Sequence, residues 1–121
     1  MQAFVFDTYS LFEIINGNPN YAKYVNSQII INEFIFAELC YKLMREGSAE
    51  KSNFYAEKYK HLIATPGAET IKEAMLFRTY NKKKNLSATD CIGYIMAKNL
   101  KIKFLTGDQQ FENMENVEFV K

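Results

Sequence analysis

The chain has 121 residues, of which 48% are hydrophobic and 15% aromatic, so it can build one domain around one core, expected over residues 1–121. Its net charge of +1 argues against tight, non-specific nucleic-acid binding, but not against an enzyme that grips one substrate in a small cleft. No apolar run approaches the ~20 residues of a membrane span, and we identify no signal peptide. Both cysteines lie in apolar helical patterns, as buried thiols of the core do and disulfide frameworks do not. Free thiols are typical of proteins in a reducing compartment, so a cytoplasmic location is expected.

The first half of the chain alternates short apolar runs with helical patterns. Residues 3–6 are apolar at every position, as in a parallel strand covered on both faces. Asn32 and Ser48 are suited to cap the two longer helices that follow. The expected elements are a strand at 3–6, a helix at 9–15, a short helix at 20–26, a strand at 28–31 and helices at 33–46 and about 49–60.

The second half repeats this alternation. Its expected elements are a short strand at 61–64, a helix at about 68–81, a basic loop at 81–85, a helix at 88–99, a strand at 102–105, a helical turn after residue 108 and an edge strand at 117–120. Strands that alternate with helices predict parallel βαβ units with right-handed crossovers. The expected fold is therefore α/β, a three-layer α/β/α sandwich with a central, mostly parallel sheet.

Two predicted strands end in a carboxylate, Asp7 after the first and Asp108 after the last buried one. Ligands of open α/β sheets bind beyond the carboxyl ends of the strands, so these acids can converge although they are about a hundred residues apart. Each has a simpler interpretation: Asp7 as a helix N-cap, and Asp108 as a turn residue. Gly107 permits a sharp exit from the strand that aims Asp108 at the crevice.

Two more acids, Glu38 and Asp90, lie in predicted helices beside that crevice. Glu38 has apolar neighbours, so burial would require a partner, although a solvated face or pairing with Lys42 also explains it. Asp90 follows Ser87 at the spacing of an N-terminal cap, and a helix N-terminus favours negative charge in either role. A cluster of carboxylates without histidine is typical of a site for Mg²⁺ or Mn²⁺.

Other familiar sites are missing from the sequence. His61 is the only histidine and lies in a lysine-rich stretch, so we expect a surface residue and no zinc site. Neither a glycine-rich phosphate loop nor a Gly-x-Ser-x-Gly nucleophile elbow is present.

The segments around the four acids resemble those of PIN-domain ribonucleases of the VapC toxin type, over essentially the whole chain. The matching segments are Phe6-Asp7-Thr8, Glu38-Leu39, Leu86-Ser87-Ala88-Thr89-Asp90 and Thr106-Gly107-Asp108-Gln109-Gln110-Phe111. The sequence departs from the pattern at Tyr9, where many relatives carry Ser or Asn.

The resemblance implies a parallel sheet with helices on both faces and a Mg²⁺ or Mn²⁺ site at the matching acids. It implies cleavage of RNA by metal-activated water, which leaves a 5′-phosphate and a 3′-hydroxyl, and a small antitoxin partner in a complex that is often dimeric. The implied catalytic and metal-binding residues are Asp7, Glu38, Asp90 and Asp108, supported by the hydroxyls of Thr8, Ser10 and Thr106.

Basic and aromatic side chains suggest weaker assignments. Lys42 and Arg45 can contact RNA phosphates, with residues 82–84 widening that contact, although exposed lysines are most often simply solvated. An antitoxin groove, a dimer face or ordinary core would each account for the aromatic residues Tyr9, Phe12, Tyr21, Tyr24 and Phe36.

Three other function classes compete with a toxin. A housekeeping RNA-processing nuclease would use the same acids without an antitoxin, and a non-catalytic domain would use them to bind Mg²⁺ or a protein. An aspartyl-phosphate phosphatase would need a second aspartate where Tyr9 stands. Loops of transfer RNA and of ribosomal RNA are both plausible targets.

Overall fold

A four-stranded parallel sheet forms the centre of the molecule. In the computed structural model, which describes residues 1–121, the strands are β1 (Ala3–Phe6), β2 (Gln28–Ile30), β3 (Lys103–Thr106) and β4 (Val117–Phe119). Their order is β2-β1-β3-β4, and all three pairings are parallel. The central strands β1 and β3 are buried after their first residues, and the unbroken apolar run of β1 predicts this for β1.

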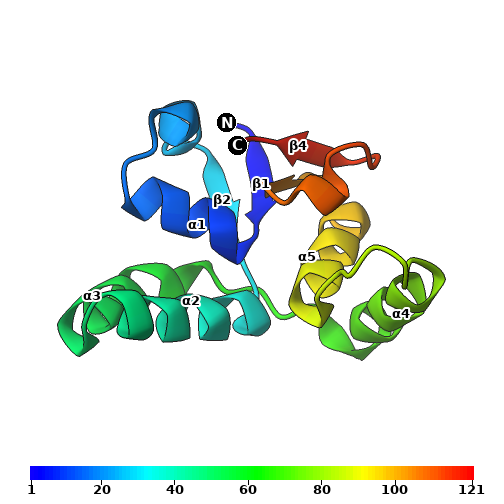
Figure 1. Ribbon diagram of the computed structural model, residues 1–121, viewed down its shortest axis with the longest axis horizontal. Coiled ribbons are helices and arrows are strands. Elements are labelled where there is room, and N and C mark those ends of the chain that lie inside the picture. Colours follow the sequence, from blue (N-terminus) through cyan, green and yellow to red (C-terminus); the bar gives the residue numbers. More distant parts are fainter.

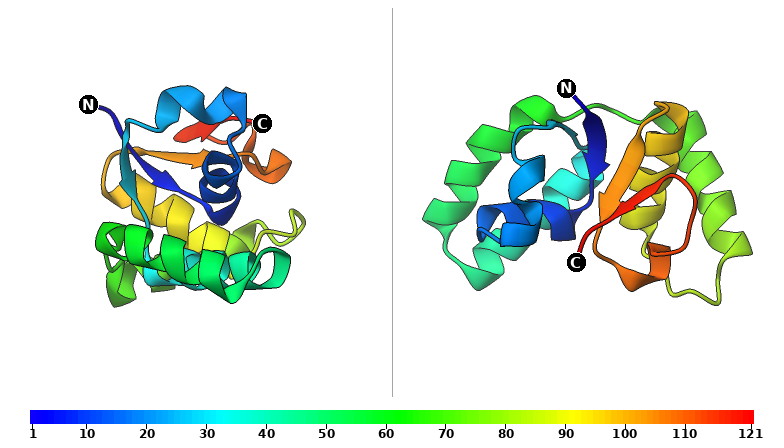
Figure 2. Two further views of the ribbon diagram at one scale, coloured as in Figure 1. Left: turned by 90° about the vertical axis from the view of Figure 1, so that its left-hand side faces the viewer. Right: turned by 90° about the horizontal axis from the view of Figure 1, so that it is seen from above.

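Helices cover both faces of this sheet. They are α1 (Thr8–Ile15), α2 (Glu33–Glu46), α3 (Ala49–Tyr59), α4 (Gly67–Tyr80) and α5 (Ala88–Asn99), with 3₁₀ turns η1 (Pro19–Tyr24), η2 (Lys60–Leu62) and η3 (Gln109–Phe111). Helices α1 and α5 pack on β1 and β3 from opposite sides (Figure 2). Figure 1 shows α2 beside α3 and α5 beside α4. The predicted three-layer α/β/α fold is confirmed.

Close packing of α5 on the sheet positions one end of the site. A Cβ atom on Gly93 would lie 2.8 Å from Cε1 of Phe104, so only glycine lets the helix approach β3 this closely. Around it, Phe104 and Phe111 pack edge to face with centroids 5.3 Å apart, and Tyr94 lies 5.5 Å from Phe111. This aromatic contact fixes the orientation of α5, and with it the start of the helix where Asp90 lies.

Four of the five α-helices begin at a side-chain cap that the sequence predicts, whereas α4 follows Pro66 without one. In each case the cap accepts a hydrogen bond from a backbone N–H three residues further on, which satisfies one of the free donors of the first turn. These caps are Asp7, Asn32, Ser48 and Ser87.

The prediction of a strand at 61–64 is wrong. Only Ile63 pairs, through one isolated parallel bridge to Ile31, whereas Lys60–Leu62 form the 3₁₀ turn that continues α3. Tyr59 is 2% exposed and anchors the end of α3 in the core. The chain therefore leaves the helix through a tight turn and reaches the sheet edge for a single residue. His61 is exposed, as expected.

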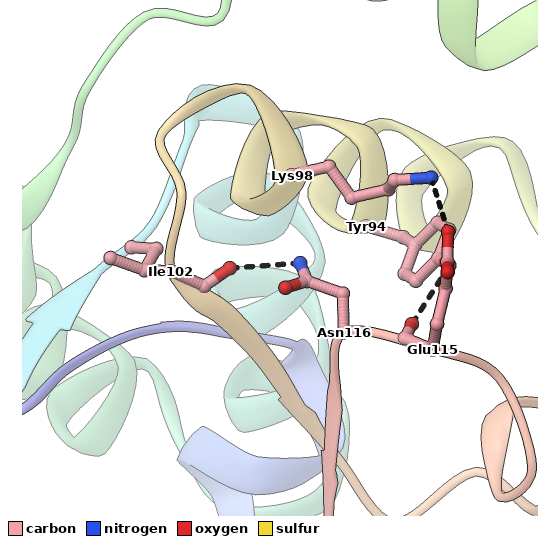
Figure 3. Close-up of polar contacts among 5 residues, drawn as sticks. All are labelled: Tyr94, Lys98, Ile102, Glu115 and Asn116. Atoms are coloured by element: carbon pink, nitrogen blue, oxygen red, sulfur yellow. Dashed lines mark hydrogen bonds and ion pairs between the residues drawn. The ribbon is translucent and has the colours of Figure 1, made fainter.

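Polar contacts anchor the connection between β3 and β4 (Figure 3). The Tyr94 hydroxyl donates to the Glu115 carbonyl at 2.9 Å, and Nζ of Lys98 lies 3.1 Å from Oε1 of Glu115. Nδ2 of Asn116, a residue with a φ of 63°, donates to the Ile102 carbonyl at 2.9 Å. These contacts fix the turn from which β4 runs parallel to β3, so β4 ends at the same edge of the sheet as β1 and β3.

Both cysteines are free thiols. Cys91 is fully buried and Cys40 partly so. Burial raises the pKa of the Cys91 thiol to about 11, which keeps it protonated and unreactive. No helix is long and apolar enough to cross a bilayer.

A candidate carboxylate site at the carboxyl edge of the sheet

A cleft of about 630 Å³ opens where β1 and β3 end. The chain moves from β1 outward to β2 and then back across to β3, so the direction of the crossovers reverses between these two strands. Such a switch point leaves a crevice at the carboxyl ends of the strands. All four predicted acids line the cleft: Asp7, Glu38, Asp90 and Asp108.

Asp7 is held by both of its carboxylate oxygens and is 2% exposed. Oδ1 accepts a hydrogen bond from the backbone N–H of Ser10 at 2.8 Å, so Asp7 is also the N-cap of α1. Oδ2 accepts one from the hydroxyl of Thr106 at 2.5 Å. The strand register pairs Phe6 with Leu105, which places Thr106 beside Asp7. Asp7 can therefore cap α1 and belong to the acid cluster at the same time.

Thr106 also connects Asp7 to Asp108. Its hydroxyl oxygen accepts a hydrogen bond from the backbone N–H of Asp108 at 3.0 Å while its proton goes to Asp7. Oδ1 of Asp108 in turn accepts from the N–H of Gln110 at 2.9 Å, which caps η3. One threonine thus orients the acids that follow two neighbouring strands.

Glu38 lies on an exposed part of α2, in agreement with the solvated-face interpretation, and it also lines the cleft. Its Oε1 accepts a hydrogen bond from the hydroxyl of Thr8 at 2.8 Å, which connects α2 to the start of α1. The alternative pairing with Lys42 is not formed. Nζ of Lys42 instead lies 4.6 Å from the centroid of the Phe12 ring. Glu38 consequently faces the cleft through a contact that the sequence does not reveal.

Asp90 is partly buried in the first turn of α5. Its backbone N–H donates to the Ser87 hydroxyl at 3.0 Å. Its carboxylate makes no ion pair, and neither do those of Asp7, Glu38 and Asp108. Four acids therefore share one cleft without a bound basic side chain.

Burial and mutual repulsion raise the pKa of two of these acids. Burial raises the pKa of Asp7 to about 6, against the hydrogen bonds from Thr106 and Ser10 that lower it. The pKa of Asp90 rises to about 7, first through burial and then through the charges of Asp7, Glu38 and Asp108. A cation bound among these carboxylates would favour the charged forms.

The donor chemistry fits a hard divalent cation, but the side chains do not form a complete cage. Four carboxylates without histidine or a free thiol match the oxygen ligands that Mg²⁺ and Mn²⁺ prefer. No group of three Asp, Glu, His or Cys side chains is arranged to hold an ion by itself. Mg²⁺ usually takes one or two protein carboxylates and completes its shell with water and substrate phosphates, so the site fits ions bound in that way.

The sequence model of the PIN domain matches residues 4–117. The chain belongs to the PIN domain family. No curated protein matches the sequence.

Solved structures with the same fold include toxins and toxin–antitoxin complexes. VapC20 of Mycobacterium tuberculosis, a sarcin-ricin loop cleaving toxin, is 12% identical, with a TM-score of 0.79 over 98% of this chain and 99% of that one. VapBC2 of Rickettsia felis, bound to a promoter DNA fragment, is 17% identical, with a TM-score of 0.74 over 99% and 100%. A toxin–antitoxin complex of Klebsiella pneumoniae is 16% identical, with a TM-score of 0.71 over 95% of each chain.

The hydroxyls expected to support the acids have different partners in this PIN domain. Thr106 contacts Asp7 and Thr8 contacts Glu38. The Ser10 hydroxyl donates to the Leu105 carbonyl at 2.9 Å, so only its backbone N–H reaches Asp7. Ser10 therefore fastens α1 to β3, and its hydroxyl makes no hydrogen bond to the four acids.

Tyr9, the departure from the family pattern, packs against Gly107. A Cβ atom on Gly107 would lie 2.7 Å from Cδ1 of Tyr9 and 2.7 Å from the Val120 carbonyl. The φ of Gly107 is not in the left-handed region, so the glycine provides space and not the sharp backbone turn predicted from the sequence. The ring also lies under Lys121, whose Nζ is 5.3 Å from its centroid.

The basic residues divide between the cleft and the surface. Lys42 and Arg45 line the cleft, as does Lys121, which the sequence analysis missed. Residues 82–84 are exposed and do not line it. The predicted edge strand at 117–120 could have indicated that Lys121 lies at the cleft, because a parallel strand brings the residue after it to this edge of the sheet.

The aromatic residues considered for a partner groove are mostly core. Tyr21 and Tyr24 are buried. Tyr9, Phe12 and Phe36 are partly buried and pack against the hydrophobic core.

The acids make the stability of the metal-free protein depend on pH. Because the pKa values of Asp7 and Asp90 are raised on folding, the folded chain binds more protons than the unfolded chain between about pH 4 and pH 7. The stabilisation is complete below about pH 4 and is lost as the pH rises through 6 to 7. We expect urea unfolding in a chelator to show a free energy of unfolding about 2 to 4 kcal/mol lower at pH 8 than at pH 5.

The variant Asp90→Asn isolates this effect from other titrating groups. It should reduce the difference between pH 5 and pH 8, and Mn²⁺ at pH 8 should stabilise the wild type more than the variant. Equal pH dependence in the two proteins would show that the carboxylates are not coupled in this way.

A second prediction concerns the contact between Gly107 and Tyr9. Gly107→Ala should lower the free energy of unfolding by about 1 to 3 kcal/mol, because the new methyl group meets the ring and the Val120 carbonyl. Tyr9→Ala in the same chain should recover part of that loss, since it removes one of the two obstacles. Gln109→Ala, at an exposed position beside the cleft, serves as the control. Strictly additive losses in the double variant would contradict the contact.

Proposed function

We propose that this PIN domain is a Mg²⁺- or Mn²⁺-dependent endoribonuclease and the toxin of a toxin–antitoxin pair. The observation that carries the proposal is the group of four carboxylates, without a basic partner, at the switch point of a PIN fold. The toxin assignment is supported by three matched structures, a VapC toxin, a VapBC structure and a toxin–antitoxin complex, which match at least 95% of this chain. We take residues 1–121 to form one nuclease domain acting in the cytoplasm.

In this proposal Asp7 and Asp90 are the principal metal ligands, because both are withdrawn from water and repel one another when charged. Glu38 and Asp108 complete the cluster directly or through water. When bound, Mg²⁺ or Mn²⁺ lowers the pKa of a water molecule and stabilises charge on phosphoryl oxygens. Cleavage of this kind leaves a 5′-phosphate and a 3′-hydroxyl on the RNA.

The hydroxyls of Thr106 and Thr8 act on the carboxylates and not on the substrate. Each donates its proton to one acid, to Asp7 at 2.5 Å and to Glu38 at 2.8 Å. Such bonds fix which oxygen lone pairs remain for a ligand, and comparable contacts in metal sites are worth about 10- to 100-fold in affinity or activity. They hold the side chains in place before substrate arrives.

In this proposal Lys42 and Arg45 bind the RNA backbone. Both lie on α2 and line the cleft beside Glu38, and the guanidinium of Arg45 lies 5.3 Å from the ring centroid of the exposed Tyr41. A cation next to an exposed aromatic ring suits a single-stranded segment, whose phosphates and unstacked bases are both accessible. Loops of transfer RNA or ribosomal RNA therefore remain the proposed targets, and a small antitoxin and a second copy of the chain the proposed partners.

The site is tested by removing single charges. Asp7→Asn and Asp90→Asn keep the size of each side chain and should each reduce Mn²⁺-dependent cleavage of total cellular RNA by about 100-fold or more. Glu69→Gln, on the exposed face of α4 outside the cleft, should cleave like the wild type. Circular dichroism should show that all three variants keep the fold. Full activity in either aspartate variant would refute the site.

An inactive wild-type protein would point to a different function. If the wild type cleaves no RNA with either ion, a non-catalytic domain that binds Mg²⁺ or a protein becomes the better explanation.

Toxicity separates a toxin from a housekeeping nuclease. Induced expression of the wild type in a bacterial host should arrest growth, while Asp7→Asn should not, because arrest requires cleavage. Co-expression of a short reading frame adjacent to the gene should restore growth if it encodes the antitoxin. Cleavage in vitro without growth arrest would favour the housekeeping function.

A further inference from the structure

We propose that Lys121 is a substrate-binding residue, which holds an RNA phosphate on the β4 side of the carboxylates. The inference rests on the proposed nuclease function and adds a residue that the motifs of the sequence do not contain.

The ammonium group of Lys121 has a defined position inside the cleft. Nζ donates a hydrogen bond to the Gly107 carbonyl at 2.9 Å and lies 5.3 Å from the centroid of the Tyr9 ring. Gly107 directly precedes Asp108, so the positive charge lies beside the acid cluster without pairing with any member of it. A lysine carries three N–H donors, and one hydrogen bond leaves two of them for a ligand.

The backbone that carries Lys121 is held on both sides. The N–H of Val120 donates to the Thr106 carbonyl at 2.9 Å, and the Val120 carbonyl accepts from the Tyr21 hydroxyl at 2.5 Å. Upstream, the contacts of Glu115 and Asn116 in Figure 3 fix the start of β4. These contacts fix the backbone from which the Lys121 side chain extends, which reduces the entropy lost on binding.

Positive charge then flanks the carboxylates from two parts of the fold. Lys42 and Arg45 belong to α2, which begins directly after the edge strand β2, whereas Lys121 follows β4, the strand at the other edge. An RNA strand that crosses the acids would meet a cation before and after them. Such contacts position the backbone without reading its sequence, so they suit the phosphates on either side of the scissile one.

Lys121 also has a purely structural interpretation, as an anchor for the Gly107 carbonyl. The two roles differ in what they change. Loss of a phosphate contact weakens substrate binding and makes it less sensitive to salt, whereas loss of an anchor lowers stability and disturbs Asp108.

The test compares Lys121→Gln and Lys121→Arg with the wild type in steady-state cleavage of a single-stranded RNA with Mn²⁺, over a series of salt concentrations. We expect Lys121→Gln to raise KM about tenfold, the effect of one charged hydrogen bond, with little change in kcat. The slope of log(kcat/KM) against log salt concentration should become shallower by about 0.7, as for one lost contact to single-stranded RNA. Lys121→Arg should recover both values, and Lys72→Gln, on the exposed face of α4, should change neither.

The outcomes separate this inference from the function on which it rests. If the wild type does not cleave RNA, the proposed function fails and the inference fails with it. If the wild type cleaves and Asp7→Asn does not, but Lys121→Gln keeps the KM and salt slope of the wild type, only the inference is overturned. A lower kcat and melting temperature with an unchanged salt slope would also overturn it and leave Lys121 as an anchor.

Discussion

The hydrogen bond from the Thr106 hydroxyl to Asp7 is the contact on which the site depends. It joins the ends of β1 and β3, which lie 99 positions apart in sequence, and the same oxygen accepts the backbone N–H of Asp108. The parallel register of these strands makes the contact possible, because it sets Thr106 beside the first residue after β1. The register of β1 and β3 therefore also determines how Asp7 and Asp108 lie relative to one another.

Helix and turn capping also contributes to the arrangement of the acids. Asp7 and Asp108 each accept a backbone N–H from the turn that they begin, and Asp90 lies in the first turn of α5. These donors and the positive ends of the helices favour negative charge. Burial opposes them and prevails for Asp7 and Asp90, whose pKa values rise to about 6 and about 7. The fold thus gathers charges that it only partly compensates, which is the condition under which a cation binds strongly.

Much of this arrangement follows from local sequence signals. Apolar runs that end in Asp7 and Asp108 predict both the buried strands and the edge at which the acids meet. Local signals do not decide between a strand and a turn at 61–64, because that depends on how Tyr59 packs at the end of α3. They also miss the contact between Thr8 and Glu38 and the position of Lys121, since each depends on elements that meet only through the tertiary fold.

The parallel attachment of β4 has a consequence for the order of assembly. Residues 117–121 leave the ribosome after every other residue that lines the cleft, and β3, which carries Thr106, is itself made late. Contacts of such long sequence separation close slowly and only once both partners are present. A nascent chain therefore carries Asp7 and Glu38 on an incomplete framework, and it can complete the cleft of four carboxylates and Lys121 only after residue 121 has been made.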